Sequence, residues 1–201
     1  SSSSAASDVY KRQTEQVQAA LRQIGISSDN PQGLFISGYF AEAEKRFAIP
    51  YNMVLASNVD ELNFLASRLE TLSTGERAEL NAALQAPQSE LFSIGRITDF
   101  PENVDYYVHL PDVHGPAQLG DYYLNRSGMV DMPEEWKGGI DTAQFGRYVA
   151  QQEQGAFTQY GYLVKSGDEW QKVHEGQPVP EEYRVLSFPA SEIPVSYTHL
   201  R

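Results

Sequence analysis

The chain holds 201 residues, of which 41% are hydrophobic, and its formal net charge is −12 at pH 7. The composition allows a buried core, while the absence of cysteine excludes a disulfide framework and is typical of a reducing compartment. No apolar run is long enough for a membrane span or a signal-peptide core, so we expect a cytoplasmic protein without membrane contact.

The two ends of the chain resemble translated adapter sequence. Residues 1–13 and 195–201 show no pattern that would join a core, so we expect both ends to be non-native. The part between them, from Thr14 to Pro194, is more acidic than the whole chain, because the ends hold three bases and one acid.

Residues 14–57 are expected to form a partial α/β segment. The spacing of apolar residues predicts a helix at 14–24, and the aromatic and aliphatic run at 34–40 predicts a strand. A turn cluster at 29–33 separates the two, and residues 50–57 are typical of a connector.

Residues 58–99 predict a central helical segment. Ser57 and Asp60 resemble a capping box, and leucines at helical spacing follow them. Ser73 or Thr74 is expected to cap a second helix, which Pro87 ends. A short third helix is expected at 89–99.

Residues 100–194 predict a C-terminal α+β segment with an antiparallel sheet. Pro116 begins a helix that Gly128 follows, and Asp141 caps another helix that ends at Gly155. The expected strands are 104–110, 157–165, 170–174 and 183–188, with a hairpin turn at 166–168, and the expected helices are 115–125, one turn after Pro133, and 141–154. The fold class is therefore expected to be α+β.

Acidic residues gather between Ile97 and Glu135. Eight acids stand there against one base, Arg126, and aromatic and aliphatic residues lie between them. A disordered acidic tail would lack those apolar residues, so we expect folded structure with a negative surface. Such a surface repels nucleic acid and attracts proteins with basic clefts. The eight acids are Asp99, Glu102, Asp105, Asp112, Asp121, Asp131, Glu134 and Glu135.

The sequence lacks the common catalytic and cofactor motifs. It has no phosphate-binding glycine loop, no Gly-x-Ser-x-Gly elbow and no cysteine-based site. His109, Asp112 and His114 could bind a metal, but loop histidines at a sheet edge are the simpler interpretation. We therefore expect no enzyme activity, no cofactor and no metal.

Short motifs between Leu34 and Val164 together resemble one protein family. Val59–Leu65 and Leu80–Leu84 are similar to its central helices, and Phe35–Tyr39 is similar to one of its strands. Three further motifs are similar to the C-terminal part of that family. They are Leu119-Gly120-Asp121-Tyr122-Tyr123, then Gly139-Ile140-Asp141 with Phe145-Gly146-Arg147, then Gly155-Ala156-Phe157. The family is that of the ArdA antirestriction proteins. Its N-terminal strand block is missing here, so we expect an N-terminally truncated member.

The resemblance implies an elongated, acidic, non-enzymatic inhibitor of type I restriction-modification enzymes, made by mobile elements such as conjugative transposons. It also implies mimicry of bent B-form DNA and a homodimer formed through the C-terminal segment. Carboxylates spaced like phosphates would then occupy the DNA-binding cleft of the enzyme. The expected phosphate mimics are the eight acids above together with Asp60, Glu61, Glu70, Glu76 and Glu79.

Other interpretations stay open at this point. One is an acidic interaction adaptor of a mobile element that docks through aromatic residues, unless these form the core. Another is an enzyme or metal protein built around His109, Asp112 and His114. A third is that the acids serve only solubility. The aromatic residues are Tyr106, Tyr107, Tyr122, Tyr123 and Trp136.

Arginines spread evenly among the acids would weaken the case for DNA mimicry. These arginines are Arg68, Arg77, Arg96 and Arg126.

Two neighbouring residues of the last motif carry structural expectations. Gly146 predicts close packing of its helix against another element. Arg147 could pair with Asp141 or Glu153 and so fix the segment that is expected to form the dimer.

Overall fold

A computed structural model describes residues 14–16, 18–19 and 47–185. It combines helices with a three-stranded antiparallel sheet, which confirms the α+β class. Residues 14–16 and 18–19 are helical, in agreement with the helix predicted there. The predicted strand at 34–40 and the adapter-like ends lie outside the described residues.

The central helical segment contains three helices, α3 (Val59–Leu69), α4 (Thr74–Gln85) and α5 (Ile94–Thr98), and α2 (Tyr51–Leu55) precedes it. Helix α2 stands where a connector was predicted, and that prediction is wrong. It forms because the carbonyl of Pro50 accepts the amides of Met53 and Val54, while the Val54 side chain is buried.

Capping boxes begin the two long helices of this segment. In α3 the box joins Asn58 and Glu61, one residue later than the predicted Ser57 and Asp60. In α4 the Ser73 side chain accepts the amide of Glu76, and the Glu76 carboxylate accepts the amide of Ser73, which confirms Ser73 as the cap. Each box satisfies two amides at the helix start that would otherwise lack partners.

The larger core lies between these helices and the sheet. The leucine stripe of α3 supplies Leu65 and Leu69, and α4 supplies Leu80, which is fully buried. Ile97 and Phe100 join them from α5 and the short helix after it. Burial of these side chains is the main stabilising contribution in this half of the molecule.

The sheet contains β1 (Tyr107–Leu110), β2 (Ala156–Thr158) and β3 (Gly161–Lys165) in the order β1-β3-β2, both pairs antiparallel. Two 3₁₀ turns, η2 (Phe100–Glu102) and η3 (Val104–Tyr106), lead into β1. The single strand predicted at 157–165 is instead a hairpin, because Gly161 adopts φ +112° and the Thr158 hydroxyl donates to the Gly161 carbonyl.

A second group of helices, which we call the C-terminal lobe, lies beyond the sheet. It comprises α6 (Pro116–Asp121), which continues into a π-helical turn η4 (Tyr122–Arg126), then α7 (Glu134–Lys137) and α8 (Thr142–Glu153). Asp141 caps α8 as predicted, by accepting the amide of Gln144.

Glycines allow α6 and α8 to touch through their backbones. A Cβ atom on Gly146 would overlap the carbonyl oxygen of Pro116, and one on Gly120 would overlap that of Thr142. The close packing predicted at Gly146 is therefore confirmed. A small core around Leu119 and Tyr162 fills the rest of this contact.

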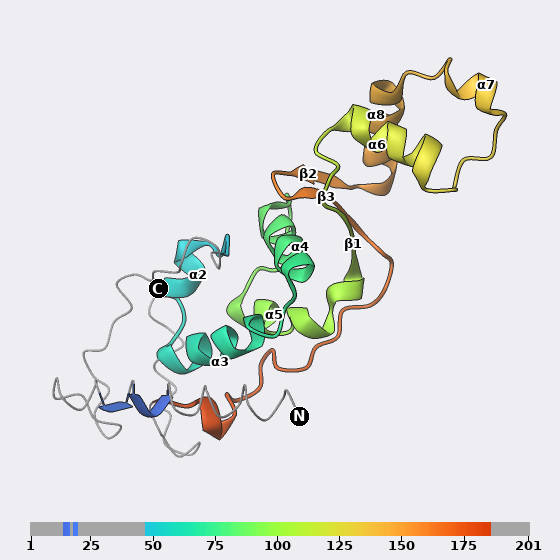
Figure 1. The fold of residues 1–201 in the computed structure, drawn as a ribbon. Helices are drawn as coiled ribbons and strands as arrows, with labels where there is room; N and C mark the ends of the chain where they lie inside the picture. The colour runs from blue at the N-terminus through green and yellow to red at the C-terminus, as the bar shows by residue number, and fades with distance from the viewer. Residues whose placement is uncertain (1–13, 17, 20–46, 186–201) are drawn as a thin grey trace.

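Residues 166–185, which we call the strap, return from the sheet along the central helices. No helix or strand forms at 166–180, so the hairpin and return strand predicted at 166–174 are wrong. The last strand predicted at 183–188 is replaced, within the described residues, by a 3₁₀ turn, η5 (Glu181–Tyr183). Figure 1 shows the strap in orange, passing α5 and reaching α3.

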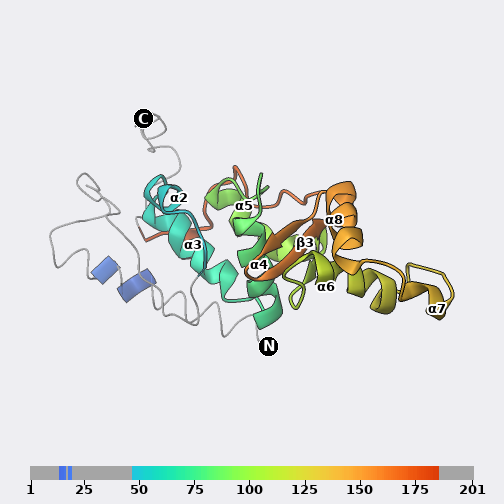
Figure 2. The ribbon, with the colours of Figure 1, turned by 90° about the horizontal axis from the view of Figure 1, so that it is seen from above.

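The described part of the molecule is elongated. The central helices form one end, the sheet lies in the middle, and α6, α7 and α8 form the other end in both views (Figures 1 and 2). The loop that carries α7 projects furthest from the sheet (Figure 2). None of the helices described here has the length and apolar character needed to cross a membrane.

Candidate partner-binding surface

Eight of the thirteen acids expected to contact a partner lie on the exposed surface. They lie between residue 70, at the C-terminal end of α3, and residue 135 in α7, which forms the far tip of the lobe (Figure 1). Five of the eight form no ion pair with any other described residue, so their charges face solvent uncompensated. These five are Glu70, Asp105, Asp112, Asp131 and Glu135; the other three are Glu102, Asp121 and Glu134.

Three of the four arginines that could have interrupted this surface are bound into the structure. Arg68 pairs with Glu102. Arg96 lies over the rings of Phe92 and Trp170, at 4.8 Å and 4.6 Å, with only 15% of its side chain exposed. Cations held against rings and carboxylates offer little positive charge to a partner.

Three other arginines differ in how they are held. Arg77 donates to the carbonyl of Leu72, whereas Arg126 is 54% exposed beside Asp121. Arg147 is exposed and forms no ion pair with a described residue. The expected ion pair with Asp141 or Glu153 is therefore absent. Glu153 instead accepts both tyrosine hydroxyls that reach it, from Tyr123 and Tyr162.

Asp99 differs from the other predicted acids, because it is fully buried. Its carboxylate accepts three backbone amides of the strap, from Val173 at 3.1 Å, His174 at 2.6 Å and Glu175 at 3.1 Å. A carboxylate in this position cannot reach a partner. We therefore correct its expected role and remove Asp99 from the proposed surface.

The acids of α3 and α4 are partly engaged in local structure. Asp60 accepts the amide of Val185 at 2.7 Å, and Glu61 and Glu76 complete the two capping boxes. Burial raises the pKa of Glu61 from its usual value. These side chains are half-buried, so each is a weaker candidate for partner contact than the exposed acids.

Glu79 is the least suited of this group to mimic a phosphate. Its Oε1 atom is buried without a hydrogen-bond partner among the described residues. Burial, with a smaller contribution from the nearby Glu76 carboxylate, raises the pKa of Glu79 from its ordinary value of 4.5 to about 8. The side chain is therefore mostly uncharged at neutral pH.

The structure does not bring the three residues of the metal hypothesis together. His109 Nε2 lies 2.7 Å from the carbonyl of Tyr160, while Asp112 and His114 are exposed in the loop after β1. The residues described contain one group of acids and histidine with atoms close enough to share an ion, namely Asp99, Glu102 and His174. The Asp99 carboxylate already accepts three amides, and Glu102 already pairs with Arg68. Contacts within the fold therefore account for the closeness of these three residues.

The aromatic residues fall into two classes. Tyr107 is buried in the larger core and Tyr106 packs against it, while Tyr122 and Tyr123 pack against the smaller core. Trp136 is 65% exposed. Two further exposed apolar residues of the lobe, Met129 and Tyr148, were missed by the sequence analysis, because loop and helix patterns do not report exposure.

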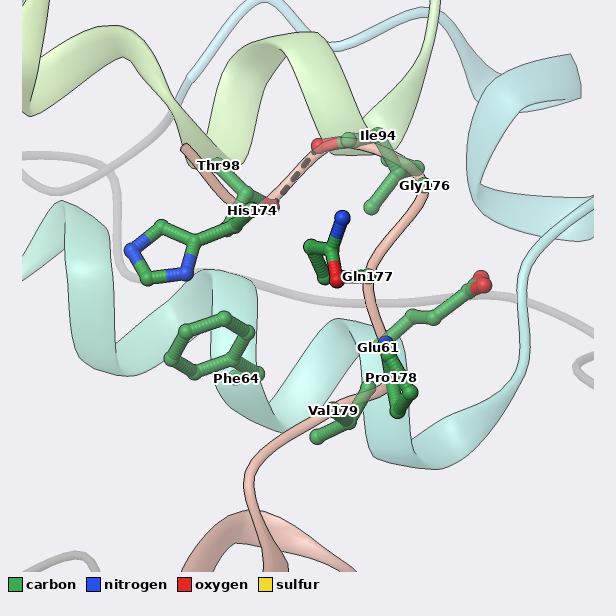
Figure 3. A pocket seen from close by; sticks show the side chains of 10 residues that line it. Glu61, Phe64, Ile94, Thr98, His174, Gly176, Gln177, Pro178 and Val179 are labelled. Carbon is green, nitrogen blue, oxygen red and sulfur yellow. Dashed lines mark hydrogen bonds between the residues drawn. The ribbon is translucent and has the colours of Figure 1, made fainter. Parts of the chain in front are cut away.

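A pocket of about 350 Å³ lies between α3, α5 and the strap (Figure 3). The His174 ring contacts Phe64 edge-on at 5.0 Å between ring centroids. Figure 3 shows the Glu61 carboxylate directed away from His174, so the two titratable groups of the pocket do not converge. The carboxylate and the imidazole of this pocket therefore do not form a cooperating acid–base pair.

Comparison with known proteins identifies the family. The family model described as antirestriction protein (ArdA) matches residues 8–164, which is more than half of the chain and extends further toward the N-terminus than the motifs beginning at Leu34. No curated protein and no solved structure matches the chain. This protein therefore belongs to the ArdA family of antirestriction proteins.

Proposed function

We propose that this protein inhibits type I restriction-modification enzymes by occupying their DNA-binding cleft in place of DNA. The observation that carries the proposal is the different placement of acidic and basic side chains in the protein. Acidic side chains are exposed along an elongated body, while Arg68, Arg77 and Arg96 are held against the protein itself. The surface therefore presents net negative charge.

The physical basis is competition for a cleft that binds phosphates. Duplex DNA carries about one negative charge per 1.7 Å of its axis, and a protein that binds it releases condensed counterions. Carboxylates held on a rigid scaffold can replace phosphates in the basic cleft without offering a bond to cut. The proposed contacts are the eight exposed acids: Glu70, Glu102, Asp105, Asp112, Asp121, Asp131, Glu134 and Glu135.

We further propose a homodimer that joins two C-terminal lobes. Met129 and Trp136 are 74% and 65% exposed, and both lie in the part of the lobe that projects furthest from the sheet (Figure 2). Large exposed apolar side chains at one end of a molecule favour a protein contact there. Dimerisation would double the length of the negative surface. We place this activity in the cytoplasm, where restriction enzymes act, and assign it no catalytic step.

The same exposed residues favour one alternative, an adaptor that binds another protein through Trp136 without mimicking DNA. The two functions differ in their dependence on charge. An adaptor would be weakened by Trp136→Ala and would tolerate salt, whereas a mimic would be weakened by salt and by loss of carboxylates.

The proposal is tested by titrating the full chain into a purified type I restriction enzyme that cleaves unmethylated DNA. We expect inhibition that additional DNA relieves and that weakens between about 50 and 200 mM salt. A variant with Asp131→Asn and Glu135→Gln should inhibit less well, while the matched variant Gln151→Asn, on the exposed side of α8, should be unchanged. Failure of a folded sample to inhibit at low salt would contradict the proposal.

A further inference from the structure

The strap (residues 166–185) lies beyond residue 164, where the family match ends. It has no helix or strand before η5, so its backbone amides and carbonyls need partners elsewhere. The structure supplies these partners from polar side chains of the central segment.

Asp99 is the main anchor of the strap. Three consecutive amides, at Val173, His174 and Glu175, point to its two carboxylate oxygens. Asp99 is also the C-cap residue of α5, where the helix dipole disfavours negative charge. The three strap amides offset that cost, which accounts for a buried carboxylate that has no ion pair among the described residues.

Further anchors hold the strap before and after this point. The amide side chain of Asn103, which is buried, accepts the amide of Gln171 at 2.6 Å and donates to its carbonyl at 2.8 Å. Asn63 of α3 donates to the carbonyl of Tyr183, and Asp60 accepts the amide of Val185.

Aromatic and charged contacts reinforce the same attachment. Arg96 of α5 lies over Trp170 and within 3.9 Å of the Glu175 carboxylate. Phe64 of α3 contacts the rings of both His174 and Tyr183, at 5.0 Å between centroids in each case. The strap is therefore bound to α5 at one point and to α3 at another.

We infer that the strap is an intramolecular lock that fixes α3 and α5 to each other, and that Asp99 is the positioning residue that holds it. If the proposed function is correct, the lock also sets the spacing of Glu70, at the end of α3, from Glu102 and Asp105. A rigid arrangement of charges loses less conformational freedom when it binds a partner.

Hydrogen exchange on the full chain tests the lock directly. Although residues 173–175 are in no helix or strand, we expect their amides to exchange on the order of 100-fold more slowly than in an unstructured peptide. Unprotected amides at these positions in the folded wild-type chain would overturn the inference without any variant.

Two variants locate the anchor. Asp99→Asn should remove the protection at 173–175 and speed cleavage by trypsin after Lys172, while α4 stays protected. The control Asp168→Asn makes the same chemical change at an exposed strap residue and should alter neither. Asn103→Ala keeps the net charge constant and should speed hydrogen exchange at the backbone amide of Gln171. Full protection of the strap in both anchor variants would overturn the inference.

The positioning role has its own readout in the inhibition assay. Asp99→Asn should weaken inhibition several-fold. A plot of the logarithm of the inhibition constant against the logarithm of salt concentration should keep its slope, because a buried carboxylate replaces no phosphate. Asp112→Asn, on the surface, should reduce that slope. A slope reduced by Asp99→Asn would overturn the positioning role. If the wild type does not inhibit at all, the proposed function fails, while hydrogen exchange still decides the lock.

Discussion

The central helices and the C-terminal lobe use acidic residues in different ways. In the central helices, Asp60, Glu61, Glu76 and Asp99 bind backbone amides, and Glu79 is held in a largely buried position. In the lobe and the loop before it, five acids extend into solvent, and those of them with ion pairs bind neighbours close in sequence, as Glu134 does with Lys137. Asp141, which caps α8, and Glu153, which accepts two tyrosine hydroxyls, are the exceptions. Most acids of the central helices therefore serve the fold, whereas most acids of the lobe face solvent.

The two regions also differ in how they are held together. The central segment has a broad apolar core and polar anchors to the strap. The lobe has a small core and depends on direct backbone contact between α6 and α8 at Gly120 and Gly146. The lobe should therefore be sensitive to added volume, and the central segment to changes in polar side chains.

The largest expected effect is at Gly146. Replacing it with valine would force side-chain atoms into the backbone of α6 at Pro116, which has no room to move while the two helices stay in contact. We expect a loss of about 3 kcal/mol or more in the free energy of unfolding, measured by thermal or urea denaturation.

The matched control is a glycine of the central segment. Gly75→Ala in α4 adds a Cβ atom that has no other atom within 4 Å. We expect it to raise the free energy of unfolding by about 1 kcal/mol or less, because alanine restricts the unfolded chain more than glycine does. Equal losses at both glycines would contradict the account of the lobe.

The next effect is a dependence on pH at Glu79. Below pH 4.5 the folded and unfolded chains both hold the proton. Above that value the unfolded chain releases it, whereas the folded chain keeps it until its pKa of about 8, so the free energy of unfolding falls as pH rises through this window.

Glu79→Gln removes this penalty. We expect it to stabilise the protein by about 1–2 kcal/mol near pH 8, after allowance for solvent screening, and to leave stability unchanged near pH 4. Paired denaturation curves at the two pH values measure the difference. Destabilisation near pH 8 would show that the ionised carboxylate has a stabilising partner.

The smallest effect on stability is expected for the exposed acids of the lobe. Asp131→Asn with Glu135→Gln should change the free energy of unfolding by less than about 0.5 kcal/mol, because neither side chain has an ion pair among the described residues. Glu76→Ala in the central segment should cost more, because it removes the side chain that accepts the Ser73 amide in a capping box. Denaturation of both variants compares the two uses of acidity directly.

Patterns local in sequence were predicted well. The leucine stripe of α3, the Ser73 cap, the Pro116 start of α6 and the Asp141 cap of α8 each depend on residues within one or two turns. The close approach at Gly146 was also predicted, since glycine within a helix needs a packing reason.

Features that depend on distant contacts were not predicted. The strap contains a hairpin-like Ser166–Gly167–Asp168, but Asp99 and Asn103, about 70 residues away, capture the amides that a return strand would have used. The burial of Asp99 and Glu79 has the same origin. A sequence shows that a residue is acidic, and only the packing shows whether its charge reaches solvent.

The central claim is best tested by binding of the full chain to a DNA-free type I restriction enzyme over a series of salt concentrations. If exposed carboxylates replace phosphates, the logarithm of the binding constant should fall linearly with the logarithm of salt concentration, with a slope of several units, and the Asp131→Asn, Glu135→Gln variant should show a shallower slope. Binding that is tight and independent of salt in both proteins would contradict the account.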